Sequence, residues 1–170
     1  AAGVCAFLNW RPPAPGGSSP VPAAAKPRAA HPARARIGVF ACECAGCISD
    51  VVDLPQTVRC ASGLPGVVTA RSVPFGCLDE GLRVMRAAVR EHRLDAAVVG
   101  ACSRRTFTPL FERALGIPVR VASLREECAA VHADDPVGAT RKARELLRIA
   151  AVRVAPVPAH AGDPLLTIVP

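Results

Sequence analysis

The stretch Asp95-Ala96-Ala97-Val98-Val99-Gly100 decides the fold, and it runs directly into Ala101, Cys102 and Ser103. It is apolar at consecutive positions, so both of its faces are expected to be buried. Strands of this kind belong to parallel sheets that helices cover on both sides. We therefore predict a central parallel strand over 95–100, with a thiol just beyond its carboxyl end.

Other apolar runs extend this pattern along the chain. Strands are predicted near 36–41, 67–73 and 118–122. Helical periodicity predicts helices over about 50–62, 79–92, 107–115, 124–132 and 136–152. Strands and helices that alternate through short links predict an α/β class fold, with a parallel sheet of about four strands and right-handed crossovers. This is a Rossmann-like or flavodoxin-like three-layer architecture.

Cysteines follow each of the four predicted strands. These residues are Cys42 and Cys44, then Cys77, Cys102 and Cys128. In an open α/β sheet the carboxyl ends of the strands share one edge, where ligands bind. Thiolates gathered at that edge favour an iron–sulfur cluster, zinc or copper. The alternative is buried structural cysteine, which is common for free thiols, and Cys60 on a helix face is predicted to be of this kind.

Charged residues near the thiols in the sequence are expected to affect the thiol pKa values and to offset the charge of a bound cluster. Cys128 is predicted in the first turns of a helix, where the helix dipole and Arg125 would lower its pKa. His132 follows one helical turn later and is expected to face the same side. The charges of Arg104, Arg105 and Arg125 would offset a negative tetrathiolate cluster, and ordinary solvated arginines are the alternative.

Composition narrows the class of protein. The 170 residues suffice for one domain with its own hydrophobic core, and no apolar stretch approaches the ~20 residues of a membrane span. Eight cysteines in a chain with α/β periodicity indicate a cytoplasmic thiol protein rather than a secreted disulfide framework. Nucleic-acid binding is disfavoured, because the +7 net charge is mostly dispersed and the chain has no Tyr and one Trp for base stacking.

Proline marks both ends of the chain. Residues 1–34 and 155–170 are Pro-rich and are predicted as linkers or tails, since proline excludes long helices and central strands. The ordered domain is predicted over 35–154, so we interpret the unit as a module of a larger chain. Cys5, in the first linker, is expected to belong to a neighbouring module.

The ordered part resembles the N-terminal iron–sulfur module of the A-type (HdrA-like) subunits of heterodisulfide reductase. The matching segments begin with Arg-Ile-Gly-Val-Phe-Ala-Cys-Glu-Cys at 36–44 and Phe-Gly-Cys-Leu-Asp-Glu-Gly at 75–81. They continue with Val-Val-Gly-Ala-Cys-Ser-Arg-Arg-Thr-Phe-Thr-Pro-Leu-Phe at 98–111 and Leu-Arg-Glu-Glu-Cys-Ala-Ala-Val-His at 124–132. The chain departs from the family pattern at several positions, among them Ala45, where the family has glycine.

The resemblance implies a 4Fe–4S cluster. It implies Cys77, Cys102 and Cys128 as ligands, with Cys44 as the fourth ligand and Cys42 as the alternative to Cys44. Cys47 is an extra thiol and a further candidate. Gly76 would let the backbone approach a bulky ligand closely.

The implied function is electron transfer in an oxidoreductase complex that is flavin-linked or bifurcates electrons. FAD is expected in a neighbouring domain or chain, and the implied partners are a flavin domain and ferredoxin-like modules. No complete active site is expected in this fragment, because it lacks paired carboxylates, a Ser/His/Asp set and a phosphate loop. Whether the heterodisulfide is the substrate stays open.

Three other hypotheses remain at this stage. One is a relative of the hydrogenase-linked subunit with a 2Fe–2S cluster, against which the Arg-Glu-x-Cys segment argues. The second is a zinc-stabilised structural or scaffolding module without redox activity. The third is an α/β interaction domain whose thiols belong to the core.

Overall fold

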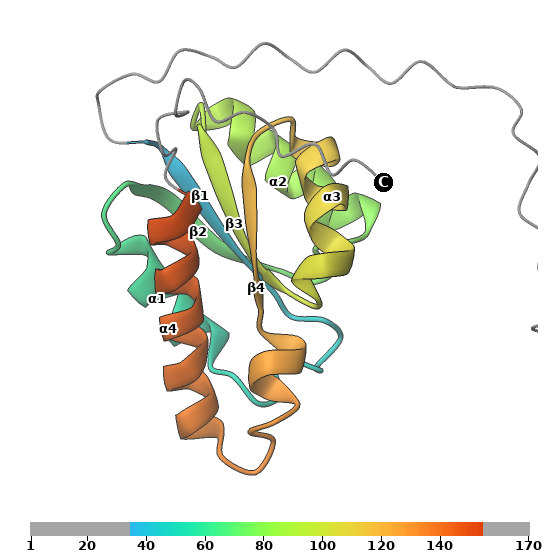
Figure 1. Ribbon diagram of the computed structural model, residues 1–170, viewed down its shortest axis with the longest axis vertical. Coiled ribbons are helices and arrows are strands. Elements are labelled where there is room, and N and C mark those ends of the chain that lie inside the picture. Colours follow the sequence, from blue (N-terminus) through green and yellow to red (C-terminus); the bar gives the residue numbers. More distant parts are fainter. Residues whose placement is uncertain (1–34, 155–170) are drawn as a thin grey trace, which may run out of the picture.

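Residues 35–154 are described by a computed structural model, and they form a parallel sheet with helices on both faces (Figure 1). The strands are β1 (Ile37–Cys42), β2 (Val67–Val73), β3 (Ala96–Ala101) and β4 (Val119–Ser123), in the order β2-β1-β3-β4. Helices α1 (Leu54–Ser62) and α4 (Pro136–Val154) pack together on one face. Helices α2 (Asp79–Glu91) and α3 (Arg104–Leu115) cover the other. The predicted α/β class and three-layer architecture are confirmed.

The two central strands carry the core. Every residue of β1 and β3 is buried, as their uninterrupted apolar sequences predict. Full burial of a large apolar side chain such as Phe40 or Val98 stabilises the fold by about 1.5–3 kcal/mol. Gly100 of β3 allows close packing, since a Cβ there would lie 2.6 Å from Leu124 and 3.1 Å from Leu147.

The pairing register brings the strand ends to one edge. Cys42 lies opposite Val73 of β2, and Ala41 lies opposite Gly100 of β3. Ala101 in turn lies opposite Ser123 of β4. The loops that follow the strands therefore leave the sheet side by side.

Helix boundaries differ from the prediction at three places. Helix α1 begins at Leu54 rather than near residue 50, because the side chain of Asp53 accepts a 2.8 Å hydrogen bond from the backbone N–H of Gln56 and caps the helix. Helix α3 begins earlier than predicted, at Arg104, directly after Cys102 and Ser103. The helix predicted over 124–132 is a five-residue π-helix, η2 (Arg125–Ala129), followed by turns.

The predicted linkers 1–34 and 155–170, together with Cys5, lie outside the described residues. None of the helices within 35–154 has the length and apolar character needed to cross a bilayer.

Candidate functional site

The thiols lie on the loops that leave the carboxyl edge of the sheet. Cys42 ends β1, and Cys44 follows in a turn. Cys77 lies between β2 and α2, Cys102 directly follows β3, and Cys128 lies within η2. Each of these five residues lies at or after the carboxyl end of a strand, on the same edge of the sheet, but their environments differ.

Two thiols from distant parts of the chain meet at this edge. The Sγ atoms of Cys44 and Cys102, 58 residues apart in sequence, lie 3.8 Å from each other. Cys102 is 8% exposed, and Cys44 is partly exposed. A small reagent can therefore reach the pair from the side of Cys44.

The Cys44 loop has an unusual backbone. Cys44, Ala45 and Gly46 have consecutive positive φ angles of 56°, 51° and 90°. Such left-handed conformations cost L-residues other than glycine about 1–2 kcal/mol each, and strain of this kind gathers at functional sites. Two backbone hydrogen bonds hold the loop against the end of β2, from the Glu43 N–H to the Val73 carbonyl (2.9 Å) and from the Cys44 N–H to the Pro74 carbonyl (3.0 Å).

Cys42 lies beneath this loop and is almost fully buried. The Gly76 backbone N–H donates to Cys42 Sγ over 3.2 Å, so this glycine contributes a donor close to the thiol. Burial raises the pKa of Cys42, the Gly76 N–H opposes that effect, and nearby charge on Cys102 and Cys77 raises it further. Cys42 is thus within electrostatic reach of Cys77 and Cys102.

Within residues 35–154, Arg125 is the cation whose side chain contacts the thiol pair. Its exposed guanidinium donates from Nη1 to Cys102 Sγ over 3.9 Å. Its pKa is raised first by that hydrogen bond and then by the charges of Cys102, Cys44 and Cys47, so all three thiols lie within its electrostatic reach.

The surroundings of Cys44 raise its pKa. Burial, the hydrogen bond with Cys102 and the charge of Cys102 raise the pKa of Cys44 to about 12, and Arg125 opposes the rise. A metal bound by this thiol must therefore displace a proton.

Cys128 has a different environment. It is 0% exposed, and its thiol donates to the Ala139 carbonyl of α4 over 3.1 Å. The predicted lowering of its pKa by the helix dipole and Arg125 is wrong, because burial raises the pKa and Lys142 opposes the rise. Arg125 reaches Cys102 instead. His132 lies one turn beyond, with its backbone N–H bonded to the Cys128 carbonyl.

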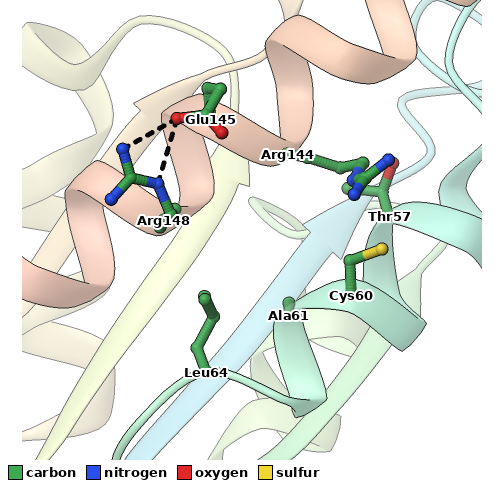
Figure 2. A pocket seen from close by; sticks show the side chains of 7 residues that line it. All are labelled: Thr57, Cys60, Ala61, Leu64, Arg144, Glu145 and Arg148. Atoms are coloured by element: carbon green, nitrogen blue, oxygen red, sulfur yellow. Dashed lines mark hydrogen bonds and ion pairs between the residues drawn. The ribbon is translucent and has the colours of Figure 1, made fainter.

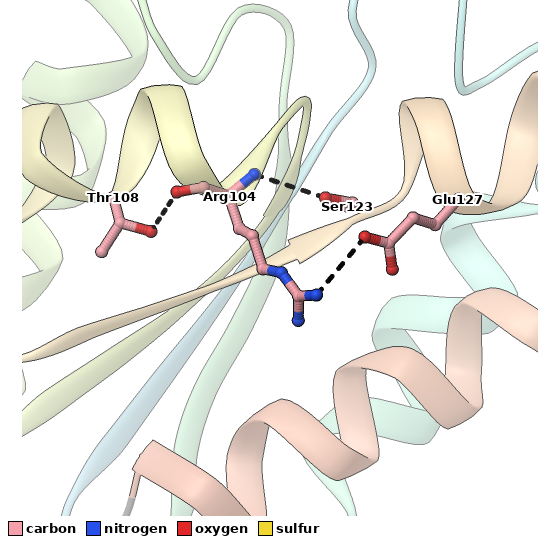
Figure 3. Close-up of polar contacts among 4 residues, drawn as sticks. All are labelled: Arg104, Thr108, Ser123 and Glu127. Carbon is pink, nitrogen blue, oxygen red and sulfur yellow. Dashed lines mark hydrogen bonds and ion pairs between the residues drawn. The ribbon is translucent and has the colours of Figure 1, made fainter.

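Arg104, two residues after Cys102 in the sequence, is engaged elsewhere. Its guanidinium lies 3.9 Å from a carboxylate oxygen of Glu127 in η2 (Figure 3). Its backbone N–H donates to Ser123 Oγ (3.3 Å), and its carbonyl accepts a hydrogen bond from the Thr108 hydroxyl (2.6 Å). Arg104 therefore links the start of α3 to the segment after β4.

Cys60 is not part of the core, so the prediction for this thiol is wrong. It is partly exposed and lines a small hollow between α1 and α4 (Figure 2). The buried residues of α1 are Leu54, Thr57 and Ala61, and Cys60 lies at the edge of that face, beside α4. The hollow is lined by Thr57, Cys60, Ala61, Leu64, Arg144, Glu145 and Arg148.

The donor set at the edge fits an iron–sulfur cluster in its chemistry. Cysteine thiolates hold such clusters, and hydrogen bonds to sulfur adjust their potential; Cys42 already accepts one from Gly76. Within residues 35–154, no three Cys, His, Asp or Glu side chains are arranged to hold a single metal ion. A cluster is larger than one ion, so the touching sulfurs of Cys44 and Cys102 would have to separate around it.

Three curated proteins similar to this chain are all A-type subunits of heterodisulfide reductases. The first A-type iron–sulfur subunit of CoB–CoM heterodisulfide reductase from Methanopyrus kandleri is 40% identical over 124 residues, which is 69% of this chain and 18% of that protein. The corresponding A-type iron–sulfur subunit from Methanocaldococcus jannaschii is 37% identical over 118 residues, covering 66% of this chain and 18% of the relative.

A third relative has a longer sequence. The A-type subunit of the ferredoxin:CoB–CoM heterodisulfide reductase from Methanosarcina mazei is 38% identical over 120 residues, covering 67% of this chain and 15% of the relative. The chain therefore spans less than a fifth of the length of these relatives. A scan against protein-family models finds no match.

Proposed function

Because the chain belongs to the HdrA family, the A-type subunits of heterodisulfide reductase, we propose that residues 35–154 form an iron–sulfur electron-transfer domain. The observation that carries the proposal is the convergence of thiols from separate strand ends, with Cys44 and Cys102 3.8 Å apart. The names of two relatives describe an iron–sulfur subunit. Thiol donors without accompanying histidine or carboxylate ligands favour such a cluster over harder metals.

The proposed cofactor is a 4Fe–4S cluster with Cys44, Cys77 and Cys102 as three of its ligands. Two thiols compete for the fourth place. The resemblance supports Cys128, which would have to give up its hydrogen bond to Ala139. The geometry supports Cys42, which accepts a hydrogen bond from the backbone N–H of Gly76, the residue beside Cys77.

The cluster would supply one-electron redox chemistry, and the residues of this chain would set its conditions. The buried end of β1 keeps water from Cys42, while the Gly76 N–H donates to its sulfur. Arg125 places a positive charge beside Cys102. The protons held by Cys44 and Cys42, whose pKa values are raised, would leave to solvent when iron binds.

The wider role follows from the family. We propose that this domain is part of an HdrA-like oxidoreductase complex of the cytoplasm that transfers or bifurcates electrons. Its proposed partners are ferredoxin-like modules and a flavin-bearing domain or chain. FAD would bind in those parts rather than in residues 35–154.

Anaerobic reconstitution of the full 170-residue chain with iron and sulfide tests the proposal. We expect a brown protein with about four irons per chain and, after reduction, an S = 1/2 EPR signal. Replacing Cys102 with Ser should abolish both, whereas Cys60→Ser, a matched change outside the thiol edge, should leave both unchanged. A 2Fe–2S spectrum would support the hydrogenase-linked alternative, and a colourless protein with stoichiometric zinc would overturn the electron-transfer proposal.

A further inference from the structure

The contact between Cys44 and Cys102 has a chemical consequence that does not depend on a cluster. A disulfide places its two sulfurs about 2.0 Å apart, and these sulfurs already face each other at 3.8 Å. They come from loops after different strands, β1 and β3, which are adjacent in the sheet. Closing the bond requires the two side chains to approach by less than the width of one sulfur atom.

We propose that Cys44 and Cys102 form a reversible redox pair in the metal-free protein, so that a small-molecule disulfide oxidises them to an intramolecular disulfide that closes the thiol site. The oxidised site would accept no metal until it is reduced. The pair would thereby protect two sulfurs from irreversible oxidation before cofactor loading.

The environment of each sulfur fits one step of thiol–disulfide exchange. Cys44 is the more exposed of the two and is the sulfur that a small disulfide can reach. Cys102 is nearly buried, so a small disulfide does not reach it directly, but its sulfur faces that of Cys44 at 3.8 Å. Cys44 therefore attacks the small disulfide first, and Cys102 resolves the resulting mixed disulfide.

The steps balance. In the first step, Cys44 gives up its proton and attacks the small disulfide R–S–S–R. The Cys44–S–S–R bond forms, the bond between the two R–S sulfurs breaks, and the released thiolate takes up the proton as R–SH. In the second, Cys102 attacks the Cys44 sulfur, forms the Cys44–Cys102 bond and releases the second R–SH. The protein loses two electrons and two protons, and the small disulfide gains both.

Four of the five other thiols of the described domain are less suited to this reaction, and the fifth, Cys77, is partly exposed on the loop after β2. Cys42 is buried and engaged by the Gly76 N–H, and Cys128 is buried against α4. Cys60 lies in the hollow between α1 and α4. Cys47 is exposed, and a mixed disulfide formed there is the expected side product.

The test uses the full chain, freed of metal by a chelator and incubated with oxidised glutathione. Remaining thiols are then alkylated, and disulfide-linked peptides are mapped by mass spectrometry. We expect one dominant cross-link, between Cys44 and Cys102, that dithiothreitol reverses. In Cys102→Ala, glutathione should stay attached to Cys44, and in Cys60→Ala the cross-link should form as in the unmodified sequence.

Two results would overturn the inference. One is a stable glutathione adduct on Cys44 in the unmodified protein, and the other is a dominant cross-link between different cysteines. Iron uptake gives an independent check, since the oxidised protein should incorporate at least about tenfold less iron until dithiothreitol is added. Because the cross-link is measured without metal, its absence would leave the proposed cluster untouched, and a colourless reconstituted protein would leave the redox pair untouched.

Discussion

The Cys44–Cys102 pair and Cys128 arise from the same sequence pattern but reach opposite environments. Each thiol follows an apolar parallel strand. The pair lies where two loops leave the sheet and Arg125 is the nearby cation, whereas Cys128 is covered by α4 and bonded to a backbone carbonyl. The strand positions a thiol at the edge of the sheet. The element that packs over that edge decides whether the thiol is free to bind a metal or cluster.

The largest expected effect separates the two candidates for the fourth ligand. From the geometry, we expect Cys42→Ser to lose most of the iron bound after reconstitution, because Cys42 is hydrogen-bonded to Gly76, the residue beside Cys77. Cys128→Ser should keep it, since a serine hydroxyl can still donate to the Ala139 carbonyl. Iron and sulfide analysis with EPR checks both variants.

The opposite result would make Cys128, rather than Cys42, the fourth ligand. Loss of iron in Cys128→Ser, with retention in Cys42→Ser, would mean that η2 rearranges and Cys128 turns toward the other thiols when the cluster binds. Far-UV circular dichroism of both metal-free variants distinguishes this from a failure to fold.

The sequence predicts the sheet well because its determinants are local. An uninterrupted apolar run such as 96–99 is buried on both faces in almost any parallel sheet. Likewise, the strand-then-thiol order places Cys102 directly after β3. Neither prediction needs knowledge of which residues pack against which.

The differences between prediction and structure depend on contacts that are distant in sequence. Nothing near Cys128 in the sequence reveals that its thiol will donate a hydrogen bond to the Ala139 carbonyl, or that Arg125 will point to Cys102 rather than to its own helix. The contact between Cys44 and Cys102 likewise depends on the left-handed turn at 44–46. The sequence carries one local indication of that turn, because the family pattern has glycine at the position of Ala45 and glycine readily adopts positive φ.

A second prediction concerns how the Cys77 loop is positioned. Gly81 in the first turn of α2 packs so closely that an added Cβ would clash with the Phe75 carbonyl. Gly81→Ala should therefore push the Cys77 loop away and lower the free energy of unfolding by about 1–3 kcal/mol, as measured by urea denaturation. Gly63→Ala is the matched control, since its nearest contact would be an ordinary 3.6 Å; an equal loss there would remove the packing explanation.

A smaller gain in stability is expected at the strained turn. Ala45 has a φ of 51°, so Ala45→Gly should relieve left-handed strain and raise the free energy of unfolding by about 0.5–1 kcal/mol after the greater entropy of the unfolded chain is counted. Ala130→Gly, at a right-handed position with φ −67°, should lower it by a similar amount. Chemical denaturation of the two metal-free variants tests the contrast, and equal signs would show that the turn is unstrained.

The smallest expected effect concerns the charge beside the pair. Arg125 donates to Cys102, whereas Arg104 is paired with Glu127. Because a nearby cation favours the more negative, reduced state of a cluster, Arg125→Gln should lower its midpoint potential, and Arg104→Gln should change it less. Arg125 is exposed, so the difference should shrink as salt rises. Redox titrations at low and high ionic strength measure it, and an equal shift in both variants would mean that net charge, rather than contact with Cys102, sets the potential.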